Sequence, residues 1–70
     1  MANLRLTYDP EVDAAYLYIV DPIPPGESVR QVACDQNVVL DYNRNGELLG
    51  IEILAASRLL PRDILGSATK

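Results

Sequence analysis

Three acidic side chains in one short turn are the first residues of this sequence that could do chemistry. Asp9, Glu11 and Asp13 alternate along YDPEVDA, and three oxygen ligands so spaced could hold a hard cation such as Ca²⁺. The twelve-residue calcium loop needs glycine at its sixth position and glutamate at its twelfth, where this chain has Ala14 and Val20. We therefore predict a structural turn without metal, in which Asp9 and Asp13 accept backbone N–H groups.

A fourth acid, Glu52, stands among apolar residues in LLGIEIL. Burial without a partner would raise its pKa, as it does for many catalytic acids. Acid–base catalysis also needs a nucleophile or a second titrating group, and the chain has no histidine. We favour an ion pair with Arg5 or Arg30 on a neighbouring strand, or a charge that discourages wrong strand pairing. Glu52 is kept as the possible functional acid.

The single cysteine and the proline-rich segment are two weaker signs of function, and we interpret both as structural features. Cys34 is the sole cysteine, and on a predicted strand its default role is that of a small buried hydrophobic residue. The prolines of DPIPPGES satisfy the PxxP pattern that binds SH3-type grooves, but their flanks are acidic. Residues 21–28 are therefore predicted to be a proline-rich loop.

Composition bounds the class of protein. Seventy residues make one domain, residues 1–70, and a core that supplies roughly 3–5 kcal/mol. One cysteine and no histidine exclude stabilisation by an intrachain disulfide or a tetrahedral zinc site. We predict no cofactor. The net charge is −4, with six basic residues spread along the chain, which argues against nucleic-acid and membrane partners. No apolar run could span a bilayer, and one lone cysteine favours the cytoplasm.

The elements that must position these residues follow from periodicity and turn signals. Alternating or β-rich runs predict strands at 3–8, 14–20, 28–34, 37–42 and 48–54. The segment AASRLLPRDILG predicts two short helical turns, with Ser57 capping the first, Pro61 opening the second and Gly66 ending it. Residues 67–70 should fray. The fold class is therefore α+β, an antiparallel β-meander of about five strands with a short C-terminal helix packed on one face.

The hairpin that carries Glu52 has a specific predicted register. Asn43-Arg44-Asn45-Gly46 fits a type I turn followed by glycine in the left-handed region, with Asn45-Gly46 at its tip. In that geometry the predicted pairs are Asn43 with Glu47, Tyr42 with Leu48, Asp41 with Leu49, Leu40 with Gly50, Val39 with Ile51, and Val38 with Glu52. Leu40 and Tyr42 would then cover the bare backbone of Gly50.

These motifs also carry a family resemblance. YDPEVDAAYLYIV and VVLDYNRNGELLGIEILAAS together resemble domain-of-unknown-function family 2283, a family of short bacterial proteins. The shared pattern comprises Tyr8, Asp9, Pro10, Glu11, Asp13, Gly46, Gly50, Ile51, Glu52, Ile53, Leu54, Ala56 and Ser57. One departure is Ala15, where the family usually carries a larger aliphatic residue, so the core should be thinner there. The resemblance covers about the whole chain and implies an antiparallel sheet with a short C-terminal helix, and no activity.

The predicted strands are apolar on both faces, and one short helix covers only one of them. Leu17, Ile19, Val39, Ile51 and Ile53 should share one face, and the predicted interface residues Tyr16, Tyr18, Leu40, Tyr42 and Leu54 the other. We therefore expect a non-enzymatic module that forms a homodimer or docks to a protein partner. The alternative is a small-ligand or divalent-metal-binding protein, or a minimal enzyme, that uses the Asp9–Asp13 turn and Glu52.

Overall fold

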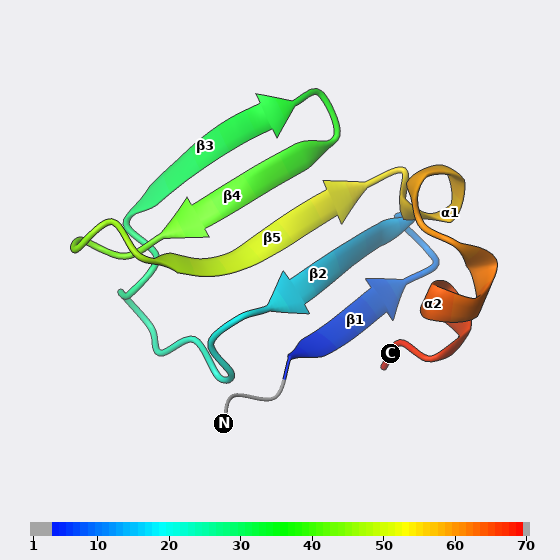
Figure 1. Cartoon of the computed structure of the whole chain (residues 1–70), viewed down its shortest axis with the longest axis horizontal. Coiled ribbons are helices and arrows are strands. Elements are labelled where there is room, and N and C mark those ends of the chain that lie inside the picture. Colours follow the sequence, from blue (N-terminus) through cyan, green and yellow to red (C-terminus); the bar gives the residue numbers. More distant parts are fainter. Residues whose placement is uncertain (1–3, 70) are drawn as a thin grey trace.

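The computed structural model describes residues 4–69 and has the predicted α+β architecture (Figure 1). The elements are β1 (Arg5–Asp9), β2 (Ala14–Tyr18), β3 (Arg30–Asp35), β4 (Val38–Tyr42), β5 (Leu48–Leu54), α1 (Ala56–Leu59) and α2 (Arg62–Gly66). All four strand pairs are antiparallel. The fold class predicted from the sequence is confirmed, and the C-terminal segment forms the two short helical turns that its sequence predicts.

The strands lie in the order β1-β2-β5-β4-β3, so the sheet is a meander only in part. The β1–β2 hairpin and the β3-β4-β5 meander form two units, and β2 pairs with β5 to join them. The proline-rich connection after β2 is long enough to carry the chain past the positions of β5 and β4 before β3 begins (Figure 1). Because β5 returns to the middle, Glu52 lies on a central strand with neighbours on both sides.

The tip of the β4–β5 hairpin has the predicted turn. Gly46 has φ 80°, and its N–H donates to the Asn43 carbonyl at 3.0 Å. The Asn43 N–H donates to the Glu47 carbonyl at 3.0 Å, and the Asn43 side-chain oxygen accepts the Glu47 N–H at 2.9 Å. Tyr42 pairs with Leu48 as predicted. The turn is therefore determined by local sequence, with glycine where a Cβ would be strained.

Beyond that first pair the predicted register is wrong by one residue. Asp41 pairs with Gly50, Leu40 with Ile51, Val39 with Glu52, and Val38 with Ile53. The shift occurs because Leu49 is an extra residue in β5, a β-bulge. Leu49 is 4% exposed, and its carbonyl accepts the N–H groups of Ile19 and Val20 where β2 ends. The side chain is thus buried while the carbonyl satisfies backbone donors of another strand.

The acidic turn between β1 and β2 is held by Asp13, which has φ 53°. Its carboxylate accepts hydrogen bonds from the Tyr8 hydroxyl at 2.7 Å, the Ser57 N–H at 2.9 Å and the Ser57 hydroxyl at 2.7 Å. Its carbonyl accepts the Ala56 N–H at 3.0 Å. The prediction that Ser57 caps α1 is wrong: Ala55 is the N-cap residue, and Asp13 satisfies the first donors of the helix from another part of the chain.

The C-terminal segment lies beside the sheet instead of over a face. In Figure 1, α1 and α2 stand at the end where β2 begins and β5 ends, and neither overlies β3 or β4. Pro61 directly precedes α2 and Gly66 is its last residue, as predicted. Thr69 then bonds to β1, donating to the Leu6 carbonyl at 2.9 Å and accepting the Tyr8 N–H at 2.8 Å. The expected frayed tail is therefore wrong at Thr69, and Lys70 lies outside the described residues.

The core is very small. Among residues 4–69, the buried hydrophobic residues are Ala15 at 2%, Leu49 at 4% and Ala56 at 0% exposure, and no large side chain is fully buried. Ala15 lies on β2 and Ala56 on α1, which packs against β2. A small residue is thus buried on each of the two elements where the helix approaches the strand.

Candidate functional site

The strand register divides the sheet into two chemically different faces, because residues opposite each other on neighbouring strands share a face. Leu17 lies opposite Leu6 and Ile51, and Ile51 lies opposite Leu40. This aliphatic face consists of Leu6, Leu17, Val38, Leu40, Ile51 and Ile53. The other, the tyrosine face, consists of Tyr16, Tyr18, Val39, Asp41, Glu52 and Leu54.

The five residues predicted to form one interface are consequently divided between the faces. Tyr16, Tyr18 and Leu54 lie on the tyrosine face, whereas Leu40 and Tyr42 lie on the aliphatic face. The expectation that they share a face fails because the bulge at Leu49 shifts β4 by one residue against β5. A one-residue shift moves every side chain to the opposite face.

The aliphatic face is incompletely covered. All six of its side chains are half-buried, and none is buried. Val32 on β3 lies opposite Leu40 and continues this face to the edge of the sheet, where it is 36% exposed. The face therefore presents contiguous aliphatic side chains on all five strands without a packed layer over them.

The tyrosine face carries a polar network centred on Tyr16. Its hydroxyl donates to Asp41 Oδ2 at 2.5 Å, and Asp41 Oδ1 accepts the Ser28 hydroxyl at 3.4 Å. Burial, followed by the hydrogen bond to the Asp41 carboxylate, raises the pKa of Tyr16 above its ordinary value. The Tyr16 ring lies across Gly50, where a Cβ would run into it. The aromatic cover of Gly50 thus comes from β2, and the prediction that Leu40 and Tyr42 supply it is wrong.

Glu52 lies beside Tyr16 and Val39 on this face and is half-buried. The predicted ion-pair partners are occupied elsewhere. Arg5 Nε donates to Asp21 Oδ2 at 2.7 Å, and the Arg30 guanidinium stacks over the ring of Tyr42 at 4.8 Å from its centroid. Among residues 4–69 the ion pair formed is that of Arg5 with Asp21, so Glu52 is a central-strand carboxylate without a cationic partner in the described chain.

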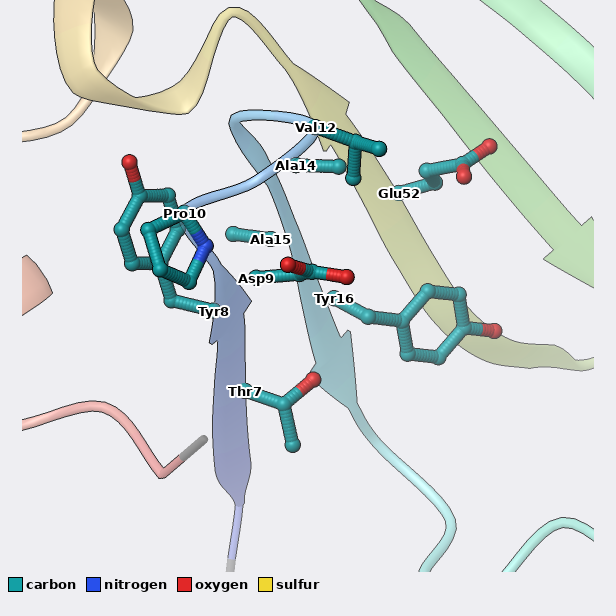
Figure 2. Close-up of a pocket in the computed structure, with 9 residues that line it drawn as sticks. All are labelled: Thr7, Tyr8, Asp9, Pro10, Val12, Ala14, Ala15, Tyr16 and Glu52. Carbon is teal, nitrogen blue, oxygen red and sulfur yellow. The ribbon is translucent and has the colours of Figure 1, made fainter.

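A shallow groove of about 410 Å³ brings Glu52 near the acidic turn (Figure 2). It is lined by Thr7, Tyr8, Asp9, Pro10, Val12, Ala14, Ala15, Tyr16 and Glu52. Figure 2 shows Asp9 and Glu52 on either side of Tyr16. The lining contains hydroxyls and carboxylates but no histidine, cysteine or lysine. It can therefore offer acceptors to a polar ligand.

The three acids of the turn do not converge on one point. Asp9 Oδ1 accepts the Glu11 N–H at 3.0 Å, which is the predicted turn geometry. The hydrogen bonds from Tyr8 and Ser57 hold the pKa of the Asp13 carboxyl below its ordinary value. The bond between Tyr8 and Asp13 also raises the pKa of the Tyr8 hydroxyl. Within residues 4–69 no group of three acidic, histidine or cysteine side chains is placed to hold a metal ion. Asp9 accepts a backbone hydrogen bond within the turn, and Asp13 accepts hydrogen bonds from Ser57 on α1.

Cys34 differs from its prediction, because it is exposed on β3. It is the extra residue between Ala33, which pairs with Val39, and Asp35, which pairs with Val38. Sequence periodicity gives no sign of a bulge at an ordinary strand residue. The Asp13–Ser57 bond was also missed, because 44 residues separate its two partners along the chain.

A known family matches most of the chain. Residues 5–57 match the family described as protein of unknown function (DUF2283). The chain belongs to this family. The matched segment of this DUF2283 protein runs from β1 to the start of α1, so it includes the Tyr8–Asp13–Ser57 bonds that join the acidic turn to the helix. No curated protein and no solved structure matches the chain. In the described part of the chain, neither helix is long and apolar enough to cross a membrane.

Proposed function

We propose that this DUF2283 protein is a non-enzymatic β-sheet module that works by association, in the first place with a second copy of itself, through its aliphatic face. The observation that supports this proposal is that, within residues 4–69, no second layer of side chains covers the aliphatic face. Among residues 4–69 the buried hydrophobic residues are two alanines and one leucine, while six large aliphatic side chains of one face remain half-buried. Burying large aliphatic side chains is the main stabilising term in folding, at about 1.5–3 kcal/mol each.

The dimensions of the molecule suit a sheet-to-sheet dimer. The chain extends 34 × 29 Å in the two long directions, which are those of the face-on view in Figure 1. A contact over about half of that rectangle would remove on the order of 1,000 Å² from water over both partners, the lower bound for a biological interface. Aligned packing of two sheets also gives a core about 10 Å thick. A two-fold contact would thus supply the core that the single chain lacks.

The placement of the charged residues supports the same face. Glu52 and Asp41 both lie on the tyrosine face, where a dry interface would have to bury them. The six residues of the aliphatic face are uncharged, and the charged residues on the same side of the sheet, Arg30 and Asp35, lie on the edge strand β3. A non-enzymatic role also accords with the lining of the groove, which within the described residues has no histidine, cysteine or lysine beside its carboxylates. We place this role in the cytoplasm, where an exposed thiol such as Cys34 stays reduced.

Light scattering after gel filtration tests the proposal. At tens of micromolar, the wild-type chain should give at least twice its mass of 7.7 kDa. Leu40→Lys, which places a charge in the aliphatic face, should lower the mass relative to wild type. Val39→Lys is the matched control, because Val39 is the preceding residue on β4 and lies on the other face, opposite Glu52.

Three results would contradict parts of this proposal. A stable wild-type monomer at that concentration would refute self-association and leave docking to a different protein as the use of this face. Equal masses for Leu40→Lys and wild type would refute the aliphatic face as the contact. Loss of the oligomer in Val39→Lys alone would assign the contact to the tyrosine face. Circular dichroism of each variant separates dissociation from unfolding.

The groove favours a second candidate function, the binding of a small polar ligand. Its lining combines the carboxylates of Asp9 and Glu52, the Tyr16 ring and the apolar side chains of Val12 and Ala14. Such a mixture is typical of small-molecule sites more than of metal sites. Native mass spectrometry of the purified protein should then show a retained mass that is lost in Glu52→Gln, and a spectrum of bare polypeptide in both would remove this candidate.

A further inference from the structure

The two edges of the sheet are treated differently by the chain. At the β1 edge, Thr69 pairs with β1 through two backbone hydrogen bonds. At the β3 edge, no segment within residues 4–69 pairs with the outer side of the strand, and all six residues of β3 are exposed. Natural proteins usually protect such an edge with proline, charged side chains, a β-bulge or a covering segment. β3 contains neither proline nor lysine, and its protection is limited to the charges of Arg30 and Asp35 at its two ends and the bulge at Cys34.

That bulge gives β3 a symmetrical arrangement of residues. Because Ala33 pairs with Val39 and Asp35 with Val38, Ala33 and Asp35 occupy consecutive positions of the ladder and Cys34 is extra. The positions of β3 that pair with β4 are therefore Arg30, Gln31, Val32, Ala33 and Asp35. Val32 is the central position, and the ends carry opposite charges.

The faces are symmetrical as well. Arg30, Val32 and Asp35 lie opposite Tyr42, Leu40 and Val38, which alternate along β4 and share the aliphatic face. Gln31 and Ala33 lie opposite Asp41 and Val39 on the tyrosine face.

We propose that β3 pairs antiparallel with β3 of a second copy about a two-fold axis through Val32. In this register Val32 lies opposite Val32 of the other copy, Gln31 opposite its Ala33, and Arg30 opposite its Asp35. Each pair joins residues of the same face, and one ion pair between Arg30 and Asp35 lies on each side of the axis. This edge contact is made by the backbone of β3, and it goes beyond the proposed face-to-face contact, which uses side chains of β1, β2, β4 and β5.

Neighbouring registers fit less well. A two-fold axis through Gln31 places Arg30 opposite Val32, and one through Ala33 places Val32 opposite Asp35, so both leave the charges unmatched. An axis between two residues sets an aliphatic-face residue against a tyrosine-face residue, which the pleat of a continuous sheet forbids. The Val32 register is the one that satisfies faces and charges together.

The edge contact would have a structural consequence. A two-fold axis perpendicular to the sheet places the two aliphatic faces on the same side of one ten-stranded sheet. Val32, which is 36% exposed in the single chain, then fills the seam between the two copies. If the faces also pack, the assembly contains four chains, with two continuous sheets face to face.

Disulfide trapping tests the register, because two cysteines can bridge only when their Cα atoms lie about 4.4–6.8 Å apart. The probe is Val32→Cys in a Cys34→Ser background, oxidised at tens of micromolar and resolved without reductant. We expect a covalent species of twice the chain mass. Wild type is the matched control, because Cys34 is an exposed cysteine on the same strand that the two-fold axis through Val32 holds away from its counterpart. Gln31→Cys with Cys34→Ser is the register control and should not cross-link above the wild-type level.

The same probe in a Leu40→Lys background separates the two contacts, since Val32 also borders the aliphatic face. Cross-linking that persists there supports the edge pairing, even if the face-to-face contact proves wrong. Cross-linking that disappears there, or that is equal in the Val32 and Gln31 variants, overturns it. Adding Arg30→Glu should reduce the cross-linked fraction, because the introduced carboxylate would face Asp35 of the other copy. An unchanged fraction would refute the charge pairing that sets the register.

Discussion

Replacing Gly50 by alanine should destabilise the protein strongly, although alanine is a small residue with an ordinary strand conformation. Gly50 is buried on β5, and the three atoms nearest to a Cβ at this position all belong to the Tyr16 side chain. The Tyr16 ring would have to move away. That movement would break the 2.5 Å hydrogen bond between the Tyr16 hydroxyl and Asp41.

The magnitude follows from two separate costs. Overpacking a fitted site costs about 1–3 kcal/mol, and loss of a hydrogen bond to a charged group costs about 1.5–3 kcal/mol. Because partial movement of the ring relieves one cost while incurring the other, we expect a net loss of roughly 2–4 kcal/mol. For a domain of this size such a loss lowers Tm by roughly 10–25 °C. Thermal unfolding followed by circular dichroism at one fixed protein concentration measures it.

A double-mutant cycle decides whether Tyr16 is the cause. In a Tyr16→Ala background the ring is gone, so Gly50→Ala should cost almost nothing, whereas in Tyr16→Phe it should remain costly. Gly66→Ala is the glycine control, since a Cβ there meets nothing within 4 Å. In Gly50→Ala the pKa of Tyr16 should also fall back toward its ordinary value in an ultraviolet titration. Equal costs of Gly50→Ala with and without the Tyr16 ring would refute the reasoning.

Three further predictions concern the turns. Gly46→Val should cost about 1–2 kcal/mol or more, because Gly46 has φ 80° and a β-branched residue is strained there; an unchanged Tm would contradict the turn. Millimolar Ca²⁺ or Mg²⁺ should not raise Tm; a rise that vanishes in Asp9→Asn/Asp13→Asn would reinstate a metal site. Since the pKa of Asp13 is lowered in the folded state, its stabilisation is present above its unfolded pKa of about 3.9 and is lost as pH falls through the folded pKa. Asp13→Asn should reduce this loss of stability at low pH only in part, because Arg5 also lowers the pKa of Asp21. The same dependence of stability on low pH in the two proteins would refute the role of Asp13.

The local features of this fold could be predicted because a few neighbouring residues determine them. The turn at Gly46 follows from a requirement for positive φ, and the break between α1 and α2 follows from the backbone limits of Pro61. The strands follow from period-two alternation. The Asp9 turn was likewise predicted, since its donor is two residues away.

The candidate site could be predicted only in its parts. Glu52 was singled out as unusual and Tyr16 was predicted to lie in an interface. That they are neighbours was not predicted, because the strand order β1-β2-β5-β4-β3 places β2 beside β5. The bond between Asp13 and Ser57 likewise joins residues that only the tertiary structure brings together. Nothing in either local sequence shows that a turn near the N-terminus will receive the first donors of a helix that begins 43 residues later.

The sequence alone therefore determined which segments are strands, where they turn, and that a chain of this size cannot make a large core. The tertiary structure alone decided which side chains share a face. A single extra residue in β5, Leu49, separated the predicted interface set into two groups. The physical reason is that the side chains of a strand alternate with a period of two residues. A local pattern predicts that alternation well, but the face each residue occupies depends on every bulge between it and the strands it joins.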